Sequence, residues 1–241
     1  MPAELPFVSC LCPTYLRPRL LQNSLACYLA QDYPADRREL LILDDAGQLT
    51  PQRGDGWEVI SVARRFRSLP EKFNALAGLA RGEVLVVWED DDIYLPWHLT
   101  AHVAALSSGG FSKPSRVLSL YTGTLQEEAG AGRFHASIAF TREAYETAGG
   151  WPLTKRGDFD QQLLTRLSQA ATTVDPCHTH PPSYVFRWGS THAYHGQGLM
   201  QTASDTQWYD RVPLNHPAAP ARPPLSPSFD DETAQVVGSR Q

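Results

Sequence analysis

Short apolar runs alternate with amphipathic segments through the first half of the chain. Strands are expected at four of these runs, which are Phe7–Cys12, Glu39–Leu43, Trp57–Val62 and Val84–Trp88. Between them, leucines at helical spacing predict a helix over Arg19–Ala30, and a second helix is expected over Glu71–Ala80. Strand–helix–strand units of this kind fold with right-handed crossovers. The pattern therefore predicts an α/β protein with a doubly wound, Rossmann-like sheet flanked by helices.

The second half of the chain carries further signals of both kinds. Helices are expected over Trp97–Leu106, Arg142–Ala148 and Asp158–Ala170, and strands over Arg116–Tyr121, Ser183–Trp188 and, at a sheet edge, His135–Phe140. The polar stretch Gly123–Gly132 predicts a loop or a hairpin. Residues 213–241 are rich in proline and then polar, so they predict a flexible tail that cannot bury much apolar surface. We expect a single domain over residues 1–212.

Acidic residues follow two of the predicted strands at the point where each strand ends. The four acids Glu89–Asp92 follow Val84–Trp88, and Asp44–Asp45 follows Glu39–Leu43. Ligands bind outside the carboxyl ends of strands in open α/β sheets, so a switch point here would bring both acidic ends to one crevice. Adjacent carboxylates repel one another unless they are neutralised, and they suit a hard ion such as Mn²⁺ or Mg²⁺. The alternatives are a solvated acidic loop for Glu89–Asp92 and a turn or helix cap for Asp44–Asp45.

Composition narrows the class of protein. The chain has 241 residues, of which 42% are hydrophobic and 20% are charged, as in ordinary globular proteins. A formal net charge of -5 gives no overall attraction to nucleic acid or to anionic membranes. Four cysteines do not form a disulfide framework in a chain this long, and no apolar run approaches the roughly 18 residues of a membrane span. We therefore expect a cytoplasmic protein without a transmembrane segment.

Four segments carry a recognisable combination of motifs. They are VSCLCPTYLRPRLLQNSLACYLAQDYP, LLILDDAG, NALAGLARGEVLVVWEDDDIYLPWHL and GGWPLTKRGDFDQQLLTRL. In this order they resemble the inverting, nucleotide-sugar-dependent glycosyltransferases of family 2, and the resemblance covers residues 5 to about 195. It implies the GT-A fold in a single domain, with a nucleotide-binding half over about 5–106 and an acceptor half over about 107–212. It also implies a nucleotide-sugar donor and Mn²⁺ or Mg²⁺ as cofactor.

The resemblance further implies a nucleotide site near the end of the first strand. Pro13, Thr14 and Tyr15 would lie against the base and the ribose. Asp45 would accept a hydrogen bond from a uracil-like base. Asn74, which opens the third segment, is assigned to the same site.

Metal ligands are implied by the same resemblance. Asp90 and Asp91 match the family's Asp-x-Asp region, with Asp91 as the metal ligand and Asp90 nearer the ribose or the sugar. Many GT-A enzymes add a histidine from a loop near the C-terminus to the metal shell. His192 and, less favoured, His195 lie in a stretch, GSTHAYHG, that resembles such a loop.

A catalytic base is implied by the fourth segment. Asp158 matches the family's base, although the usual Glu-Asp pair is here Gly157-Asp158, which leaves Asp160 as the alternative. Helical spacing puts the two aspartates about 200° apart, so only one can face the crevice. Asp158 is preferred because it lies at the start of its predicted helix. Such a carboxylate would deprotonate the acceptor hydroxyl in a single displacement that inverts the anomeric carbon.

Basic and aromatic residues complete the set of candidates. Lys72 is assigned to the nucleotide because it would add positive charge near the phosphates, and Arg64, Arg65 or Arg67 are weaker candidates for the same task. For each arginine a solvated surface position is the alternative. Trp151 is the tryptophan best placed to stack on a sugar, and packing in the core is its alternative.

The functional hypothesis is a metal-dependent, inverting glycosyltransferase that moves a sugar from a nucleotide-diphosphate donor, with UDP as the favoured nucleotide, to a hydroxyl acceptor. One alternative is a nucleotidyltransferase, which would normally carry a glycine-rich, basic phosphate loop after the first strand. The sequence CPTYLRPR is not such a loop. The other alternative is an inactive module that binds nucleotide-sugars. Residue types leave a glycan, a lipid, a small molecule and a modified nucleic acid open as the acceptor.

Overall fold

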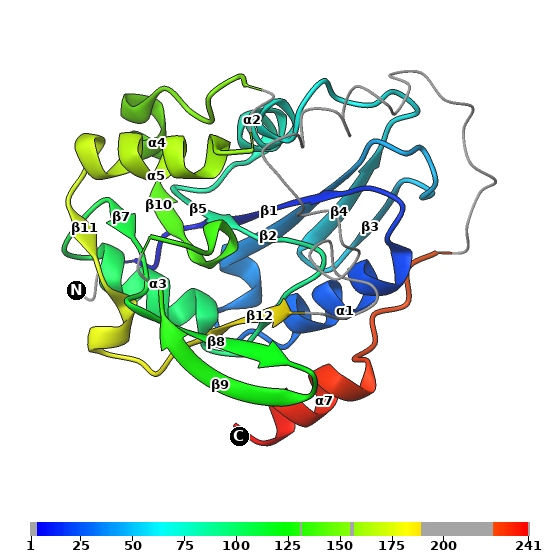
Figure 1. Cartoon of the computed structure of the whole chain (residues 1–241). Helices are drawn as coiled ribbons and strands as arrows, with labels where there is room; N and C mark the ends of the chain where they lie inside the picture. The colour runs from blue at the N-terminus through cyan, green and yellow to red at the C-terminus, as the bar shows by residue number, and fades with distance from the viewer. Residues whose placement is uncertain (1–3, 131, 155–156, 189–223, 241) are drawn as a thin grey trace.

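A computed structural model describes residues 4–130, 132–154, 157–188 and 224–240. Its largest feature is an eight-stranded sheet whose order is β11-β7-β10-β5-β1-β2-β4-β3 (Figure 1). In that order the strands are Thr173–Val174, Phe111–Ser112, Ala139–Thr141, Val84–Val87, Val8–Thr14, Arg38–Asp44, Trp57–Ser61 and Gln52–Gly54. The second sheet has the order β6-β12-β8-β9, with strands Ile93–Tyr94, Tyr184–Trp188, Arg116–Tyr121 and Thr124–Ala129.

Helices lie on both faces of the large sheet. The described α-helices are α1 Pro18–Leu29, α2 Leu69–Leu79, α3 His98–Leu106, α4 Arg142–Ala148, α5 Phe159–Ala170 and α7 Asp231–Gly238. Three short 3₁₀ turns, η1 to η3, cover Ala35–Arg37, His135–Ser137 and Pro176–His178. Figure 1 shows α2, α4 and α5 on one side of the sheet and α1 and α3 on the other. The prediction of a doubly wound α/β sheet flanked by helices is confirmed.

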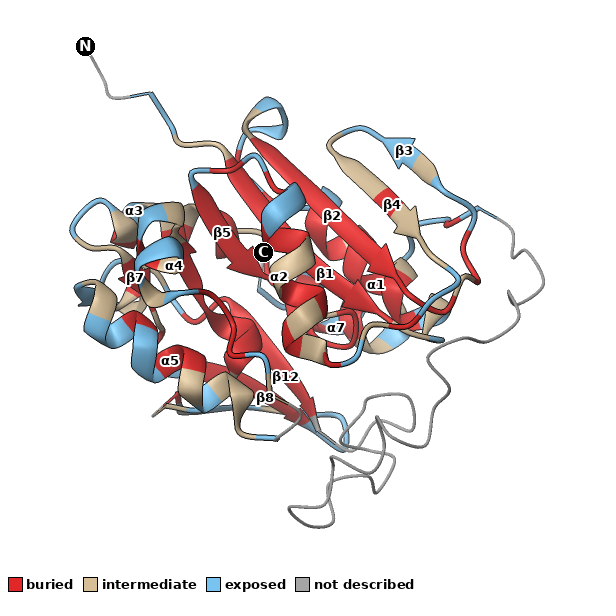
Figure 2. Ribbon diagram, turned by 90° about the horizontal axis from the view of Figure 1, so that it is seen from above, coloured by how far each residue is buried: buried red, intermediate tan, exposed pale blue. Residues whose placement is uncertain are grey.

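The central strands explain why their sequences are almost wholly apolar. Every residue of β1, β2 and β5 is buried, because helices cover both faces of the sheet (Figure 2). β1 pairs in parallel with β2 on one side and with β5 on the other. The chain therefore extends the sheet from β1 through β2 to β4 and then returns to the opposite side of β1. This reversal makes the carboxyl ends of β1 and β5 a topological switch point.

One prediction about the second half of the chain needs revision, and another is confirmed. His135–Phe140, expected as an edge strand, divides into η2 and β10, and β10 lies inside the sheet, antiparallel to both β5 and β7. The polar stretch 123–132, expected as a loop or a hairpin, contains β9, which forms a hairpin with β8. Thr122 and Gly123 form its two-residue turn with φ of 47° and 80°, the left-handed region that such turns require.

The tail also differs from the prediction. Within the proline-rich and polar segment, residues 224–240 include α7, and three apolar side chains of these residues, Leu225, Val236 and Val237, are buried in the main core. The sequence showed no apolar periodicity here because the two buried apolar residues of the helix, Val236 and Val237, are adjacent. Residues 213–223 lie outside the described part of the chain. Within the described part, no helix is both long enough and apolar enough to cross a bilayer.

Candidate active site

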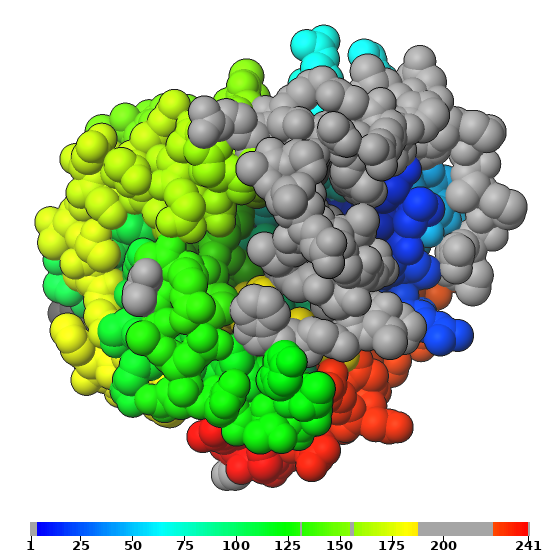
Figure 3. All heavy atoms as spheres, in the orientation of Figure 1, coloured from blue at the N-terminus to red at the C-terminus, as the bar shows by residue number. Residues whose placement is uncertain are grey.

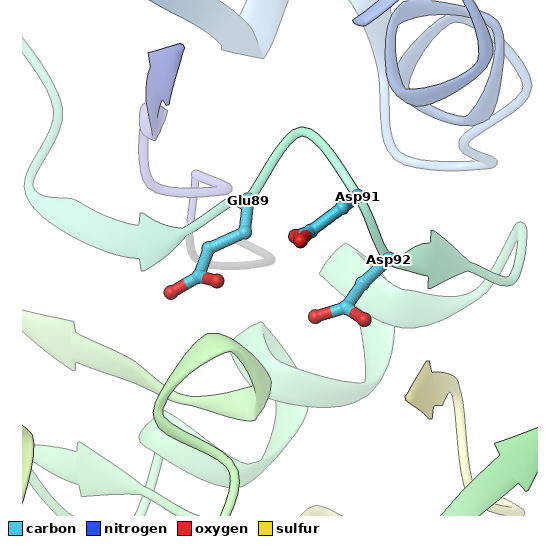
Figure 4. A group of neighbouring side chains, drawn as sticks. All are labelled: Glu89, Asp91 and Asp92. Carbon is cyan, nitrogen blue, oxygen red and sulfur yellow. The ribbon is translucent and has the colours of Figure 1, made fainter. Parts of the chain in front are cut away.

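The acidic stretch forms a loop between β5 and β6 at the switch point. Asp90, Asp91 and Asp92 are each no more than 5% exposed, and Glu89 is half-buried. One carboxylate oxygen from each of Glu89, Asp91 and Asp92 lies within 4.8 Å of the others. Figure 4 shows the three side chains projecting from the same loop. A solvated surface loop, the alternative from the sequence, is therefore excluded for the three aspartates.

Among the described residues, Arg17 places a guanidinium group directly against this loop. Its Nη1 atom lies 3.0 Å from Asp90 Oδ1 and 2.8 Å from Asp91 Oδ2. Two residues, Tyr15 and Leu16, separate Arg17 from the end of β1, and α1 begins directly after Arg17; Leu16 has a φ of 56°. The turn after β1 therefore directs a guanidinium at the acids after β5. The sequence offered the motif TYLRPR, but only the pairing of β1 with β5 shows what Arg17 faces.

The other two members of the acidic group are held by the second sheet and by η2. Tyr184 Oη donates to Asp92 Oδ2 at 2.6 Å, and the backbone N–H of Arg187 donates to Asp92 Oδ1 at 3.3 Å. His135 Nδ1 lies 3.3 Å from Glu89 Oε1. Because Trp151 Nε1 donates to His135 Nε2 at 2.9 Å, a neutral His135 carries its proton on Nδ1 and donates it to Glu89. These supporting residues carry no motif of their own in the sequence.

Burial and mutual repulsion shape the electrostatics of the loop. Burial, with the nearby charge of Asp91, raises the pKa of Asp90 to about 6 despite the opposing effect of Arg17. Burial, followed by the charges of Asp91 and Glu89, raises the pKa of Asp92 well above its usual value. A divalent cation would relieve this accumulation of charge, and carboxylate oxygens are the ligands that Mg²⁺ and Mn²⁺ prefer. Glu89, Asp91 and Asp92 fit such an ion.

The acids after β2 belong to the same edge of the sheet. Lys72 Nζ donates to Asp45 Oδ1 at 2.5 Å and to the backbone oxygen of Thr14 at 2.6 Å. Thr14 Oγ1 in turn donates to Asp90 Oδ2 at 2.6 Å. A continuous chain of contacts therefore joins Asp45 to Asp90 across the end of β1. This confirms the expectation that the two acidic strand ends meet in one place.

Asp44 has a different role from its neighbour. Its carboxylate is fully buried and accepts from the backbone N–H groups of Ala46, Gln48 and Leu49, each at 2.9 Å, and from Ser61 Oγ at 2.9 Å. These bonds hold the turn that follows β2, which is the turn-forming alternative from the sequence. Asp45 also accepts from the N–H of Phe66 at 2.9 Å, so it fixes the segment that leads to α2.

The predicted nucleotide residues lie at the end of β1 or beside it. Pro13 and Thr14 are the last residues of β1 and are buried. Tyr15 follows them, and the guanidinium of Arg65 lies 4.7 Å from the centre of its ring. Arg65 is buried, whereas its sequence neighbours Arg64 and Arg67 are exposed. Burial lowers the pKa of Lys72, and its charge is matched by Asp45 rather than presented to solvent.

Asn74 and Trp151 are committed to packing. Asn74 Nδ2 donates to the backbone oxygen of Trp151, and Asn74 Oδ1 accepts from the Trp151 N–H, each at 2.9 Å. The same oxygen accepts from Tyr145 Oη at 2.8 Å. The Trp151 ring is 1% exposed and stacks on Phe73 with centroids 4.8 Å apart. Trp151 therefore packs in the core, which was the alternative to stacking on a sugar, and Asn74 holds its backbone there.

The two candidate bases lie at the start of α5. Asp158 immediately precedes the helix, and its Oδ1 atom accepts from Gln162 Nε2 at 3.1 Å. Asp160 Oδ1 accepts from the backbone N–H of Gln161 at 2.7 Å. The start of α5 lies near the acidic loop, because Phe159 packs edge-on against His135 with centroids 5.6 Å apart. His192 and His195 lie outside the described residues.

Comparisons with known proteins agree with the fold. Neither a protein-family model nor a curated protein sequence matches this chain. The solved structure of TarS 1-349 from S. aureus in complex with UDP-GlcNAc aligns with 14% identity over 84% of this chain and 64% of that one, with a TM-score of 0.62. The mannosyltransferase PcManGT from Pyrobaculum calidifontis, in complex with GDP-Man and Mn²⁺, aligns with 21% identity over 82% and 61%, with a TM-score of 0.60.

The alignments cover part of each solved structure at low sequence identity. The chain spans a little over three fifths of the length of each of those two proteins. At this level of sequence identity the likeness establishes the fold, which this chain shares with structures of glycosyltransferases. The chemistry of the chain has to be argued from its own residues.

Proposed function

We propose that this protein is a metal-dependent, inverting glycosyltransferase of the GT-A type, similar to family 2, that transfers a sugar from a nucleotide-diphosphate donor to a hydroxyl group. The observation that carries the proposal is the approach of Glu89, Asp91 and Asp92 to within 4.8 Å at the switch point of the sheet. The presence of UDP-GlcNAc, or of GDP-Man with Mn²⁺, in proteins of the same fold supports it. UDP is the proposed nucleotide.

Residues 5–106 form the proposed donor half. The base and the ribose would lie near Tyr15 and Asp45, at the end of β1 and β2. Lys72 would act there by holding Asp45 and the backbone of Thr14, which it contacts at 2.5 and 2.6 Å. Thr14 also contacts Asp90, so the same hydrogen bonds would position both Asp45, on the nucleotide side of the site, and Asp90, in the acidic loop.

Glu89, Asp91 and Asp92 would hold the Mn²⁺ or Mg²⁺ ion. When bound, such an ion balances negative charge on the departing diphosphate. His135, Tyr184 and Arg17 each contact an acid of the loop and would orient it. Arg17 would also contribute positive charge on the donor side, because its guanidinium already lies between Asp90 and Asp91.

Asp158 is the proposed general base. It would take the proton of the acceptor hydroxyl as that oxygen attacks the anomeric carbon from the face opposite the departing diphosphate. The position of Asp158 at the start of α5, beside η2, supports this assignment because η2 carries the histidine that contacts Glu89. Residues 107–212 would supply the acceptor half.

Donor turnover tests the proposal. Purified protein is incubated with Mn²⁺ and a panel of UDP- and GDP-sugars, and release of the nucleoside diphosphate is measured. We expect slow hydrolysis of at least one donor, abolished by EDTA and restored by Mn²⁺. Nucleotide-sugar binding without any turnover would instead favour the inactive binding module.

The base is tested with a matched pair of variants. Asp158→Asn should retain donor binding and lose transfer by about 10³-fold or more, whereas Asp160→Asn, two residues away in the same helical turn, should stay within a few-fold of wild type. Nucleotide affinity is measured by calorimetry and turnover by release of the diphosphate. The reverse result would move the base to Asp160.

A further inference from the structure

We propose that Asp230 and Glu232, at the start of α7, hold the Arg187 side chain, and that Arg187 thereby keeps Asp92 in the geometry of a ligand to the proposed metal ion. This inference rests on the proposed function, because it concerns the ion-binding group of that site. It assigns a role to a segment that lies more than 130 residues from Asp92 in the sequence. We use the term clamp for Arg187, Asp230 and Glu232 together.

The first step is the ion pair at the centre of the clamp. Arg187 Nη2 donates to Glu232 Oε2 at 2.7 Å and to Asp230 Oδ2 at 3.0 Å, and its Nε atom donates to Glu232 at 3.1 Å. The Arg187 side chain is only 5% exposed, whereas the two acids are 39% and 34% exposed. The guanidinium is therefore fixed in place by two carboxylates that come from a single helix turn.

The second step connects Arg187 to the acidic loop. The backbone N–H of the same residue donates to Asp92 Oδ1 at 3.3 Å. Tyr184, three residues earlier in β12, donates to the other oxygen of Asp92 at 2.6 Å. Because β12 pairs with β6, whose first residue follows Asp92 directly, the position of β12 sets both donors at once.

The third step is the anchoring of α7 to the body of the protein. Asp230 N–H donates to Asn23 Oδ1 at 3.2 Å, and Ser228 N–H donates to the backbone oxygen of Gln22 at 3.3 Å. Val236 and Val237 are buried in the main core. Figure 3 shows the C-terminal residues, in red, along the lower edge beside the green hairpin residues. The clamp is thus attached to α1 on one side and to β12 on the other.

Stability alone does not account for a buried arginine at this position. A buried ion pair contributes little net stability compared with an apolar packing of similar size, because desolvation offsets the attraction. A donor that orients a ligating carboxylate, in contrast, typically changes metal affinity by about 10- to 100-fold. The two acids hold the Arg187 side chain, and the backbone N–H of Arg187 contacts Asp92. An orienting role therefore accounts for the buried arginine better than a contribution to stability does.

Mn²⁺ affinity of the full chain tests the clamp without any donor or turnover. The test variant is Asp230→Ser with Glu232→Gln, in which serine still caps α7 while both carboxylates that hold Arg187 are lost. Mn²⁺ is titrated into protein, and the free ion is followed by electron paramagnetic resonance. We expect binding to weaken by about tenfold, the lower end of the range for outer contacts of a metal site. The single variant Glu232→Gln should weaken it by a few-fold, and it serves if the double variant does not fold.

Two controls separate positioning from a purely structural role. Asp231→Asn removes one negative charge from the same turn without removing a contact to Arg187, and Val59→Ala loosens the core in β4, which pairs with β2 and β3 and not with the elements that carry the clamp. Both should bind Mn²⁺ as wild type does, although Val59→Ala should melt at a lower temperature. Equal Mn²⁺ affinity in wild type and in the folded clamp variants overturns the clamp alone. A wild-type chain that binds no Mn²⁺ overturns both the clamp and the metal-dependent function.

Discussion

The two acidic strand ends look alike in the sequence but have different roles in the fold. After β2, Asp44 accepts four hydrogen bonds from neighbouring backbone and side-chain donors. After β5, the buried acids accumulate, and Arg17 contacts two of them. The first carboxylate is satisfied by its own turn, while the second group retains excess negative charge. A carboxylate is therefore a candidate ligand where the fold gathers several acids at one point.

The same contrast separates Asp44 from Asp45. Asp45 contacts Lys72 and the N–H of Phe66, and through Lys72 and Thr14 it is linked to Asp90. One aspartate thus stabilises a turn, and the next one belongs to the shared edge where the crevice is proposed. The two neighbours can differ this much because Asp44 is the last residue of β2, whereas Asp45 lies in the bend that follows the strand.

The largest expected effect is on the group after β5. Asp91→Asn should abolish Mn²⁺ binding and lower donor turnover by about 10³-fold, because several kcal/mol of charge stabilisation depend on the ion. The stability of the metal-free protein should change by about 1 kcal/mol or less, since the substitution also relieves repulsion within the loop. Calorimetric Mn²⁺ titration and diphosphate release provide the two measurements. Retained Mn²⁺ affinity would remove Asp91 from the ligand set.

The matched substitution after β2 should have the opposite profile. Asp44→Asn keeps the shape of the side chain but places an amide NH₂ where the carboxylate accepted hydrogen bonds from buried donors. We expect a loss of about 2–4 kcal/mol in the free energy of unfolding, measured by urea titration, because buried donors lose their acceptor. Mn²⁺ affinity of the folded variant should equal that of wild type. A stable Asp44→Asn protein that binds Mn²⁺ poorly would reverse the roles assigned to the two strand ends.

The smallest expected effect is the contribution of the acidic loop to the pH dependence of stability. Burial raises the pKa of Asp90 from 3.8 to about 6, so between about pH 4 and 6 the folded state holds a proton that the unfolded state has lost. Stability from this group is therefore present at low pH and is lost as the pH rises through 6. From pH 5 to pH 7 the loss should be about 1 kcal/mol.

Asp90→Asn isolates this contribution. The free energy of unfolding of wild type and variant is measured in EDTA at pH 5 and pH 7, and the difference between the two proteins is compared. Effects of other titrating groups, such as the buried His102, whose pKa burial lowers to about 3, are common to both proteins and cancel. If wild type and variant differed in free energy of unfolding by the same amount at pH 5 and at pH 7, the protonation of Asp90 would make no contribution to stability in this range.

Much of the fold followed from local patterns. The apolar runs that became β1, β2 and β5 were recognisable because strands covered on both faces are apolar throughout. The segment that contains β10 was predicted as an edge strand, but β10 lies inside the sheet. Periodicity could not show this, because the pairing partners of a strand depend on long-range packing. α7 was missed because its anchors are two valines and an ion pair with Arg187, a residue that is distant in sequence.

The proposed site could be outlined from the sequence in part for the same reason. Asp91 and Asp45 stand next to buried strands and could be found by position alone. Arg17, His135 and Tyr184 could not, because each acts on an acid that is 46 to 92 residues away. Asn74 had the right place in a motif, yet its amide is occupied by the Trp151 backbone.

By itself, the sequence determined which segments form the sheet and that acids end two of its central strands. These properties depend on apolar periodicity and on residue order, which are local. Only the tertiary structure decided which acids gather at one point, since a carboxylate's environment comes from strands, turns and helices that meet in space. Asp44 is satisfied within five residues and by Ser61, while Glu89, Asp91 and Asp92 gather at one point with partners drawn from β12, η2 and the turn after β1.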